Sequence, residues 1–169
     1  MARLVFSDGI DYARVKIYRG IPGLPPLQVA IAPNGHIYFP QNHYLSDFTQ
    51  AGAAYRIWLI HELAHVWQRH NGFYPWLGGL LLIFCGGYWR RKGYVYPKLE
   101  CIQHIGRLNL EQQADLIAHY YAAKYQPQSH YSSQLPQFEQ VLKLFLQQPR
   151  NRKLRPSYRP RMWSWLLAK

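Results

Sequence analysis

Alternation of apolar and polar side chains near the N-terminus predicts a small β-sheet. Residues 13–18 alternate in this way, as expected for a strand with one buried face. Two short apolar runs, 27–31 and 36–39, lie on either side of Asn34-Gly35, and such a pair between such runs is a strong hairpin signal. We therefore expect a small antiparallel sheet at this end of the chain.

Helical periodicity follows the predicted strands. Three helices are expected, over residues 49–70, 109–125 and 136–148. At the start of the second helix, Asn109 is followed three residues later by Gln112, which is the spacing of a capping box. A chain of 169 residues in which strands are followed by helices predicts one α+β domain.

Most of the positive charge lies at the C-terminal end. The chain has 20 basic and 8 acidic residues, a net charge of +12. Residues 141–169 hold eight of the basic residues and no acidic one, so the net charge of residues 1–140 is only +4. We divide the chain into a domain over 1–148 and a basic, tryptophan-containing tail over 149–169. The tail is open to three interpretations: a solvated or partner-docking segment, a contact with an anionic membrane surface or cell-wall polymer, or nucleic-acid binding, for which no module is recognisable.

An apolar, glycine-rich insert over 76–89 interrupts the domain. Its 14 residues fall short of the roughly 20 that a membrane-spanning helix needs. A buried hairpin or core segment is the first interpretation; a membrane-inserting element and a spanning helix are the alternatives. No secretory signal peptide is recognisable, which is expected of a protein that is cytoplasmic or exported without a Sec signal.

The first long predicted helix carries the candidate chemistry. His61, Glu62 and His65 form the pattern HExxH, which this composition would produce by chance in about one chain in a hundred. Residues four apart share one face of a helix, so both imidazoles can bind one metal ion. Two unrelated surface histidines are the alternative, but the flanking residues are apolar, and buried polar side chains there need a partner such as a metal.

A third ligand is expected from downstream. Glu111, at the start of the second helix, is the best candidate, although a glutamate is also favoured in a first helical turn by the helix dipole. Glu100 and Glu139 compete with it, and His104 is a further alternative. Asp115 lies four residues after Glu111, where its carboxylate can accept the second ring N–H of a ligating histidine.

HExxH followed by a later ExxxD resembles the gluzincin branch of the zincin metallopeptidases. The resemblance implies a zincin-like domain with a small antiparallel sheet, an active-site helix and a ligand helix. It also implies Zn²⁺ bound by His61, His65 and Glu111, with Glu62 as general base and Asp115 supporting a zinc-binding histidine.

The wider sequence resembles the small metallopeptidases associated with Rhs and Vgr elements of bacterial type VI secretion. This resemblance extends over about residues 27–125 and rests on the strings at 35–39, 47–48, 61–68 and 110–115. It implies a bacterial, secretion-associated effector or a processing peptidase. A secretion-apparatus or immunity protein is then an expected partner.

A zincin reaction needs two further features. Substrate is expected to add as a strand beside the metal, and the segment 36–39 is the candidate edge. A donor must stabilise the tetrahedral oxyanion, for which His119 and Tyr120 are the first candidates. The alternatives are Tyr74, Tyr94, Tyr96 and His104, and for each of these residues taken alone a structural role is the favoured interpretation.

The predicted activity is therefore zinc-dependent hydrolysis of an amide bond in a protein or a peptidoglycan stem peptide. Two alternatives stay open. One is a non-catalytic structural zinc module that docks a partner. The other is a membrane-associated peptidase that uses the apolar insert and the basic tail to bind an anionic membrane.

Overall fold

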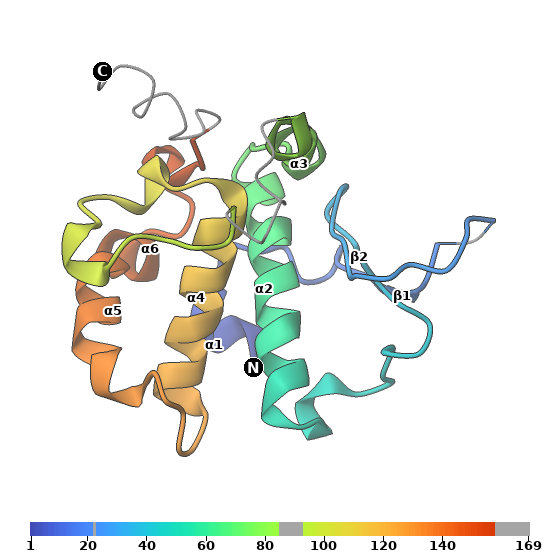
Figure 1. Cartoon of the computed structure of the whole chain (residues 1–169), viewed down its shortest axis with the longest axis horizontal. Coiled ribbons are helices and arrows are strands. Elements are labelled where there is room, and N and C mark those ends of the chain that lie inside the picture. The colour runs from blue at the N-terminus through green and yellow to red at the C-terminus, as the bar shows by residue number, and fades with distance from the viewer. Residues whose placement is uncertain (22, 85–92, 158–169) are drawn as a thin grey trace.

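Two long helices, α2 (Ala53–His70) and α4 (Leu110–Tyr125), lie side by side at the centre of the computed structural model (Figure 1). Asn109 starts α4 with the predicted capping box, because its side chain and that of Gln112 each accept the other's backbone N–H. The structure describes residues 1–21, 23–84 and 93–157.

The sheet is parallel, which corrects the antiparallel sheet expected from the sequence. β1 (Ile17–Arg19) pairs in parallel with β2 (Ile37–Phe39). The predicted hairpin is present only as a single antiparallel bridge between Ile31 and Tyr38. Alternating side chains indicate a strand but not its direction, which here depends on how the long connection returns the chain to β1.

Backbone hydrogen bonds occupy both sides of β2, which corrects its predicted role as a free edge for substrate. On one side, both backbone groups of Tyr38 bond to Ile31. On the other side, β2 bonds to Lys16 and Gly20. A peptide that adds a strand to this sheet would have to use one of the outer segments.

The helices differ from the predicted ones mainly at their ends. Asp47 accepts hydrogen bonds from the backbone N–H and hydroxyl of Thr49, and so caps a separate turn, η1 (Phe48–Gln50), ahead of α2. The third predicted helix is divided into α5 (Leu135–Val141) and α6 (Lys143–Gln147). Further helical segments in the described part of the chain are α1 (Ala2–Phe6), η3 (Leu99–Cys101), η4 (Ile105–Arg107), η5 (Ser132–Gln134) and η6 (Arg152–Leu154).

The apolar insert begins as helix α3 (Pro75–Phe84), next to the C-terminal end of α2 (Figure 1). Gly78 of α3 packs closely on Phe73, but Trp76 is 56% exposed, so α3 is only partly buried. Residues 85–89 of the insert lie outside the part of the chain that the structure describes. Within that part, no helix combines the length and the apolar character needed to cross a membrane.

The packed structure continues into the first part of the predicted tail. The indole N–H of Trp67 on α2 donates to the carbonyl oxygen of Pro149 at 2.7 Å, and Leu154 is buried. Residues 149–157 therefore pack on the domain. Residues 158–169 lie outside the described residues.

We expect Gly106→Ala to destabilise the domain. A Cβ atom at Gly106 would collide with the carbonyl oxygen of Lys153, so η4 and the C-terminal segment would have to separate. The expected loss is about 1–3 kcal/mol of unfolding free energy, measured by urea denaturation. Gly52→Ala is the control, because its Cβ position has no atom within 4 Å; its expected loss is about 0.5 kcal/mol. Equal stability of the two variants would contradict the packing of residues 149–157 on η4.

Candidate metal centre

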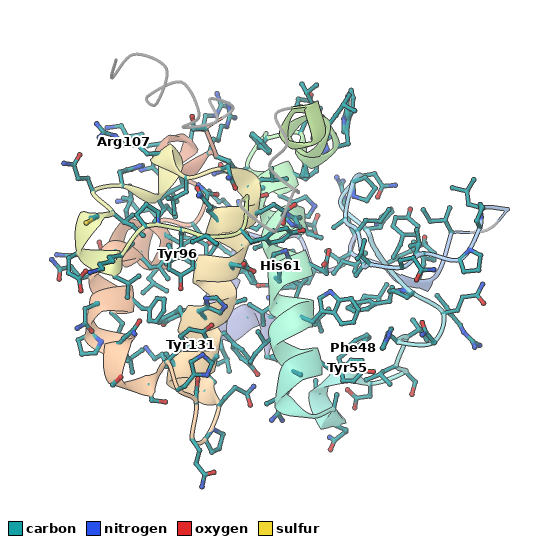
Figure 2. The ribbon with its side chains drawn as sticks, in the orientation of Figure 1. Phe48, Tyr55, His61, Tyr96, Arg107 and Tyr131 are labelled. Carbon is teal, nitrogen blue, oxygen red and sulfur yellow. The ribbon has the colours of Figure 1, made fainter. Side chains whose placement is uncertain are left out.

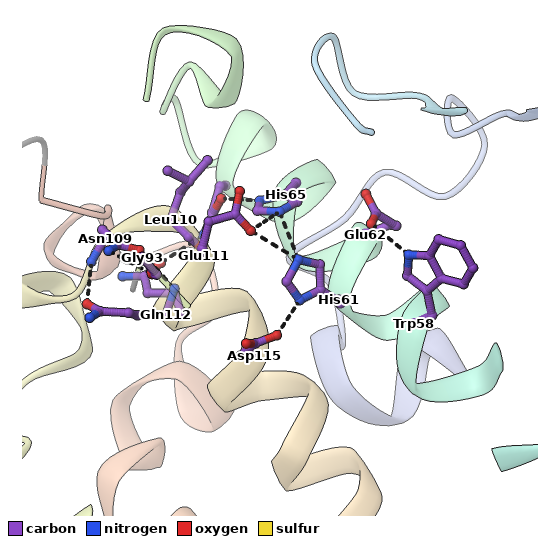
Figure 3. A network of polar contacts seen from close by, with 12 residues as sticks. Trp58, His61, Glu62, His65, Gly93, Asn109, Leu110, Glu111, Gln112 and Asp115 are labelled. Atoms are coloured by element: carbon purple, nitrogen blue, oxygen red, sulfur yellow. Dashed lines mark hydrogen bonds and ion pairs between the residues drawn. The ribbon is translucent and has the colours of Figure 1, made fainter. Parts of the chain in front are cut away.

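His61 and His65 face α4 from successive turns of α2. Their Nε2 atoms lie 3.2 Å apart (Figure 3). Glu111, in the first turn of α4, places its Oε2 atom 3.2 Å from Nε2 of His61 and 3.4 Å from Nε2 of His65. The three side chains lie within the contact between the two central helices, and His65 and Glu111 are buried.

Each histidine uses its other ring nitrogen in a hydrogen bond within the protein. Nδ1 of His61 donates to Oδ1 of Asp115 at 2.8 Å (Figure 3). Nδ1 of His65 lies 3.0 Å from Oε1 of Gln68. Because Nδ1–H faces an oxygen in both cases, Nε2 is the nitrogen that each neutral ring can offer to a cation beside Glu111.

The geometry and chemistry of this group fit a metal ion. Three acceptor atoms that face one another in a buried space repel each other unless a cation lies between them. Ligands 2.0–2.1 Å from a tetrahedral zinc ion are about 3.3–3.4 Å apart, close to the spacing of His61, His65 and Glu111. These three residues could therefore hold a metal ion.

The charges of the centre follow from the same contacts. Burial lowers the pKa of His61, but hydrogen bonds to Asp115 and Glu111 outweigh it and raise this pKa to about 10. Burial raises the pKa of Glu111, but the charge of His65 and the hydrogen bonds from both histidines keep it well below its usual range. The protein alone thus stabilises positive charge at this point, which is what a metal cation would supply.

Glu62 is held on the opposite side of His61 from Asp115 (Figure 3). Its Oε1 atom accepts a hydrogen bond from the indole N–H of Trp58 at 3.2 Å. Its Oε2 atom is buried, and no residue that the structure describes is its hydrogen-bond partner. Burial raises the pKa of the Glu62 carboxyl group. A nearly dry carboxylate beside a candidate metal centre is suited to proton transfer.

The structure distinguishes between the candidate third ligands. Glu111 meets both histidines, whereas Glu139 forms an ion pair with Lys124 at 2.8 Å. Glu100 is exposed in η3. His104 caps η4 by accepting the backbone N–H of Gly106.

His119 lies one turn after Asp115 on α4. Its Nδ1 atom lies 2.8 Å from the hydroxyl oxygen of Tyr96, and its ring stacks on Tyr131 with 4.1 Å between centroids. Figure 2 shows Tyr96 and Tyr131 on the α4 side of His61. Burial lowers the pKa of His119 to about 4, so this ring is neutral at pH 7. A neutral imidazole can donate a hydrogen bond from one nitrogen while the other accepts one.

The tyrosines proposed from the sequence have different surroundings. The Tyr120 ring is buried, with the ammonium group of Lys124 at 5.5 Å from its centroid, which places it in the core. Tyr94 stacks against His61, with 6.2 Å between the ring centroids. Its ring therefore contacts one of the candidate metal ligands directly. Tyr74 stacks on the guanidinium group of Arg69 instead.

Sequence reasoning missed three supporting side chains. Gln68 lies three residues after His65 on the same face of α2, so this spacing could have indicated its contact with His65. Trp58 precedes Glu62 by four residues and could have been found in the same way. Gln113 contacts Gln68 across the two helices, and no local spacing indicates that contact.

Comparison with known proteins relates the chain to one system. No protein-family model matches it. The type VI secretion system spike protein VgrG2b of Pseudomonas aeruginosa strain PAO1 is 31% identical over an alignment of 132 residues, and the alignment covers 73% of this chain and 12% of that protein. The solved effector domain of P. aeruginosa VgrG2b has a TM-score of 0.64 and 28% identity, covering 81% of this chain and 77% of that domain.

The aligned part is thus only a small fraction of the full-length spike protein, but most of its effector domain. This relation agrees with the Vgr association that the sequence resemblance implied. In sequence and in fold, the chain is similar to the effector domain of a type VI secretion spike protein.

Proposed function

We propose that the chain is a zinc-dependent metallopeptidase that hydrolyses an amide bond. The observation that supports this most directly is the convergence of three lone-pair atoms, from His61, His65 and Glu111, at the spacing of zinc ligands. Two histidines and one carboxylate leave the fourth position of a tetrahedral zinc ion open, which is the arrangement of catalytic sites.

Glu62 is the proposed general base. Zinc, when bound, lowers the pKa of a coordinated water to about 7 and polarises the substrate carbonyl group. Glu62 accepts a proton from the attacking water and passes it to the nitrogen of the leaving amine. Trp58 holds one oxygen of Glu62, which leaves the other oxygen for this transfer.

A structural zinc module explains these features less well. Structural zinc sites usually have four protein ligands, and the described residues supply three here. A buried Glu62 with one oxygen that has no hydrogen-bond partner among the described residues is also unfavourable for folding. A role of Glu62 in proton transfer would explain why the protein tolerates this unfavourable burial.

The relation to the VgrG2b effector domain suggests where such an activity would be used. We propose that the chain acts as a bacterial effector on protein or on peptidoglycan stem peptides. Its partners would be a component of the secretion apparatus, which delivers it, and an immunity protein, which protects the producing cell.

We expect purified wild-type protein to contain about one zinc ion per chain, measured by elemental mass spectrometry. Glu111→Ala should lose most of this zinc, because it removes one of three protein ligands. Glu139→Ala is the matched control, since Glu139 lies at the surface and pairs with Lys124. If Glu111→Ala retains its zinc, Glu111 is excluded as a zinc ligand. A folded wild type that binds no zinc would contradict the proposed function.

We expect Glu62→Gln to retain zinc but to lose amide hydrolysis. Removal of the general base should lower kcat by about 10²–10⁴-fold, measured with an unfolded protein and with peptidoglycan stem peptides. Glu100→Gln, at an exposed position, should leave kcat unchanged. Unchanged hydrolysis in Glu62→Gln would assign the general base to another residue. Zinc-loaded wild type that cleaves neither substrate would favour the structural zinc module.

A further inference from the structure

Two glutamines that the proposed chemistry does not use are completely buried beside the centre. Gln68 on α2 and Gln113 on α4 are both 0% exposed. A buried amide has two donor hydrogens and an acceptor oxygen, and each unsatisfied group costs about 1–3 kcal/mol. The hydrogen-bond partners of the two amide groups therefore indicate the structural role of Gln68 and Gln113.

The hydrogen bonds of Gln68 fix its orientation. Its Nε2 atom lies 3.0 Å from the carbonyl oxygen of Leu110 and 3.2 Å from Oε1 of Gln113, so both of its hydrogens have acceptors. Its Oε1 atom lies 3.0 Å from Nδ1 of His65. The reverse orientation would direct the amide oxygen at the carbonyl oxygen of Leu110, which cannot donate.

Gln113 in turn holds Gln68. Its Nε2 atom donates to the carbonyl oxygens of Ile105 at 2.8 Å and Leu154 at 2.9 Å. With both of its hydrogens used in this way, Gln113 can present only its oxygen to Gln68. The carbonyl groups of Ile105 and Leu154, both outside the two central helices, therefore determine which group donates and which accepts in the hydrogen bonds from Gln113 through Gln68 to His65.

We propose that Gln68, oriented by Gln113, is a positioning residue for His65. Because Oε1 of Gln68 can only accept, Nδ1 of His65 must carry the hydrogen, and Nε2 must present its lone pair to the metal centre. This inference rests on the proposed zinc site and adds the residue that fixes its second histidine. It also makes Leu154, in the C-terminal segment, part of the support of the site.

A neutral amide suits this position better than a carboxylate. Glu62, Glu111 and Asp115 already place three carboxyl groups around the centre. A carboxylate in place of Gln68 would still accept the hydrogen of His65. It would, however, face the oxygens of Leu110 and Gln113 without hydrogens to offer them, which would destabilise the fold.

Two substitutions of Gln68 separate positioning from packing. Gln68→Met keeps the approximate volume but removes the acceptor for His65, and we expect a 10–100-fold weaker zinc affinity. Gln68→Glu keeps the acceptor but removes the two donated hydrogen bonds. Its zinc-free unfolding midpoint should fall, while its zinc affinity should stay within about threefold of wild type. Affinity is measured on the full chain by competition with a chromogenic chelator, and stability by thermal unfolding of the zinc-free protein.

Gln126→Met is the matched control for the loss of a buried glutamine. Gln126 accepts a hydrogen bond from Arg56 at 2.8 Å at the far end of α4, so its replacement should affect stability but not zinc affinity. If Gln68→Met does not fold, Gln113→Met tests the same arrangement, with an expected loss of about three- to tenfold in affinity.

Three results would overturn the inference while leaving the zinc site in place: unchanged affinity in Gln68→Met, equal losses in Gln68→Met and Gln68→Glu, or an equal loss in Gln126→Met. A wild type that binds no zinc would instead contradict the proposed function itself.

Discussion

The repulsion between three buried acceptor atoms is the constraint on which the centre of this structure depends. His61, His65 and Glu111 meet inside the contact between α2 and α4, where the neighbouring side chains are mostly apolar. Polar atoms at such a position are tolerated only when a cation or a proton lies between them. Packing of the two helices and binding of a metal ion at the proposed site are therefore thermodynamically coupled. A bound metal ion would stabilise the folded state.

The rest of the fold maintains the register of these two helices. The capping box at Asn109 fixes where α4 begins, and hence where Glu111 stands. Gln113 ties α4 to Gln68 on α2, and through Leu154 to the C-terminal segment. A zinc ligand tolerates little displacement, because its bond length varies by only about 0.2 Å. Several hydrogen bonds, one of them local and the others between distant parts of the chain, thus serve one geometric requirement.

Local spacing predicted the candidate site much better than it predicted the fold. In each motif the two outer residues, His61 and His65 or Glu111 and Asp115, lie one helical turn apart, so helix geometry alone places each pair on one face. The capping box at Asn109 is equally local and was predicted. Strand direction is set by the long connection, and the amide pair joins residues 45 positions apart, so neither leaves a periodic signal. The packing of residues 149–157 was missed because their basic composition resembles that of a solvated segment.

The distribution of charge connects the centre to the proposed substrates. Only 8 of 169 residues are acidic, and Glu62, Glu111 and Asp115 are three of them, gathered around one buried centre. The chain as a whole is nevertheless strongly positive, with a net charge of +12. Such a field attracts anionic polymers over a distance of about one Debye length, roughly 8 Å at physiological salt. Peptidoglycan stem peptides, which are among the proposed substrates, carry free carboxylates, so a protein of this net charge would attract them more strongly than neutral peptides. Selection of substrate by charge would then be separate from the bond-breaking chemistry of the centre.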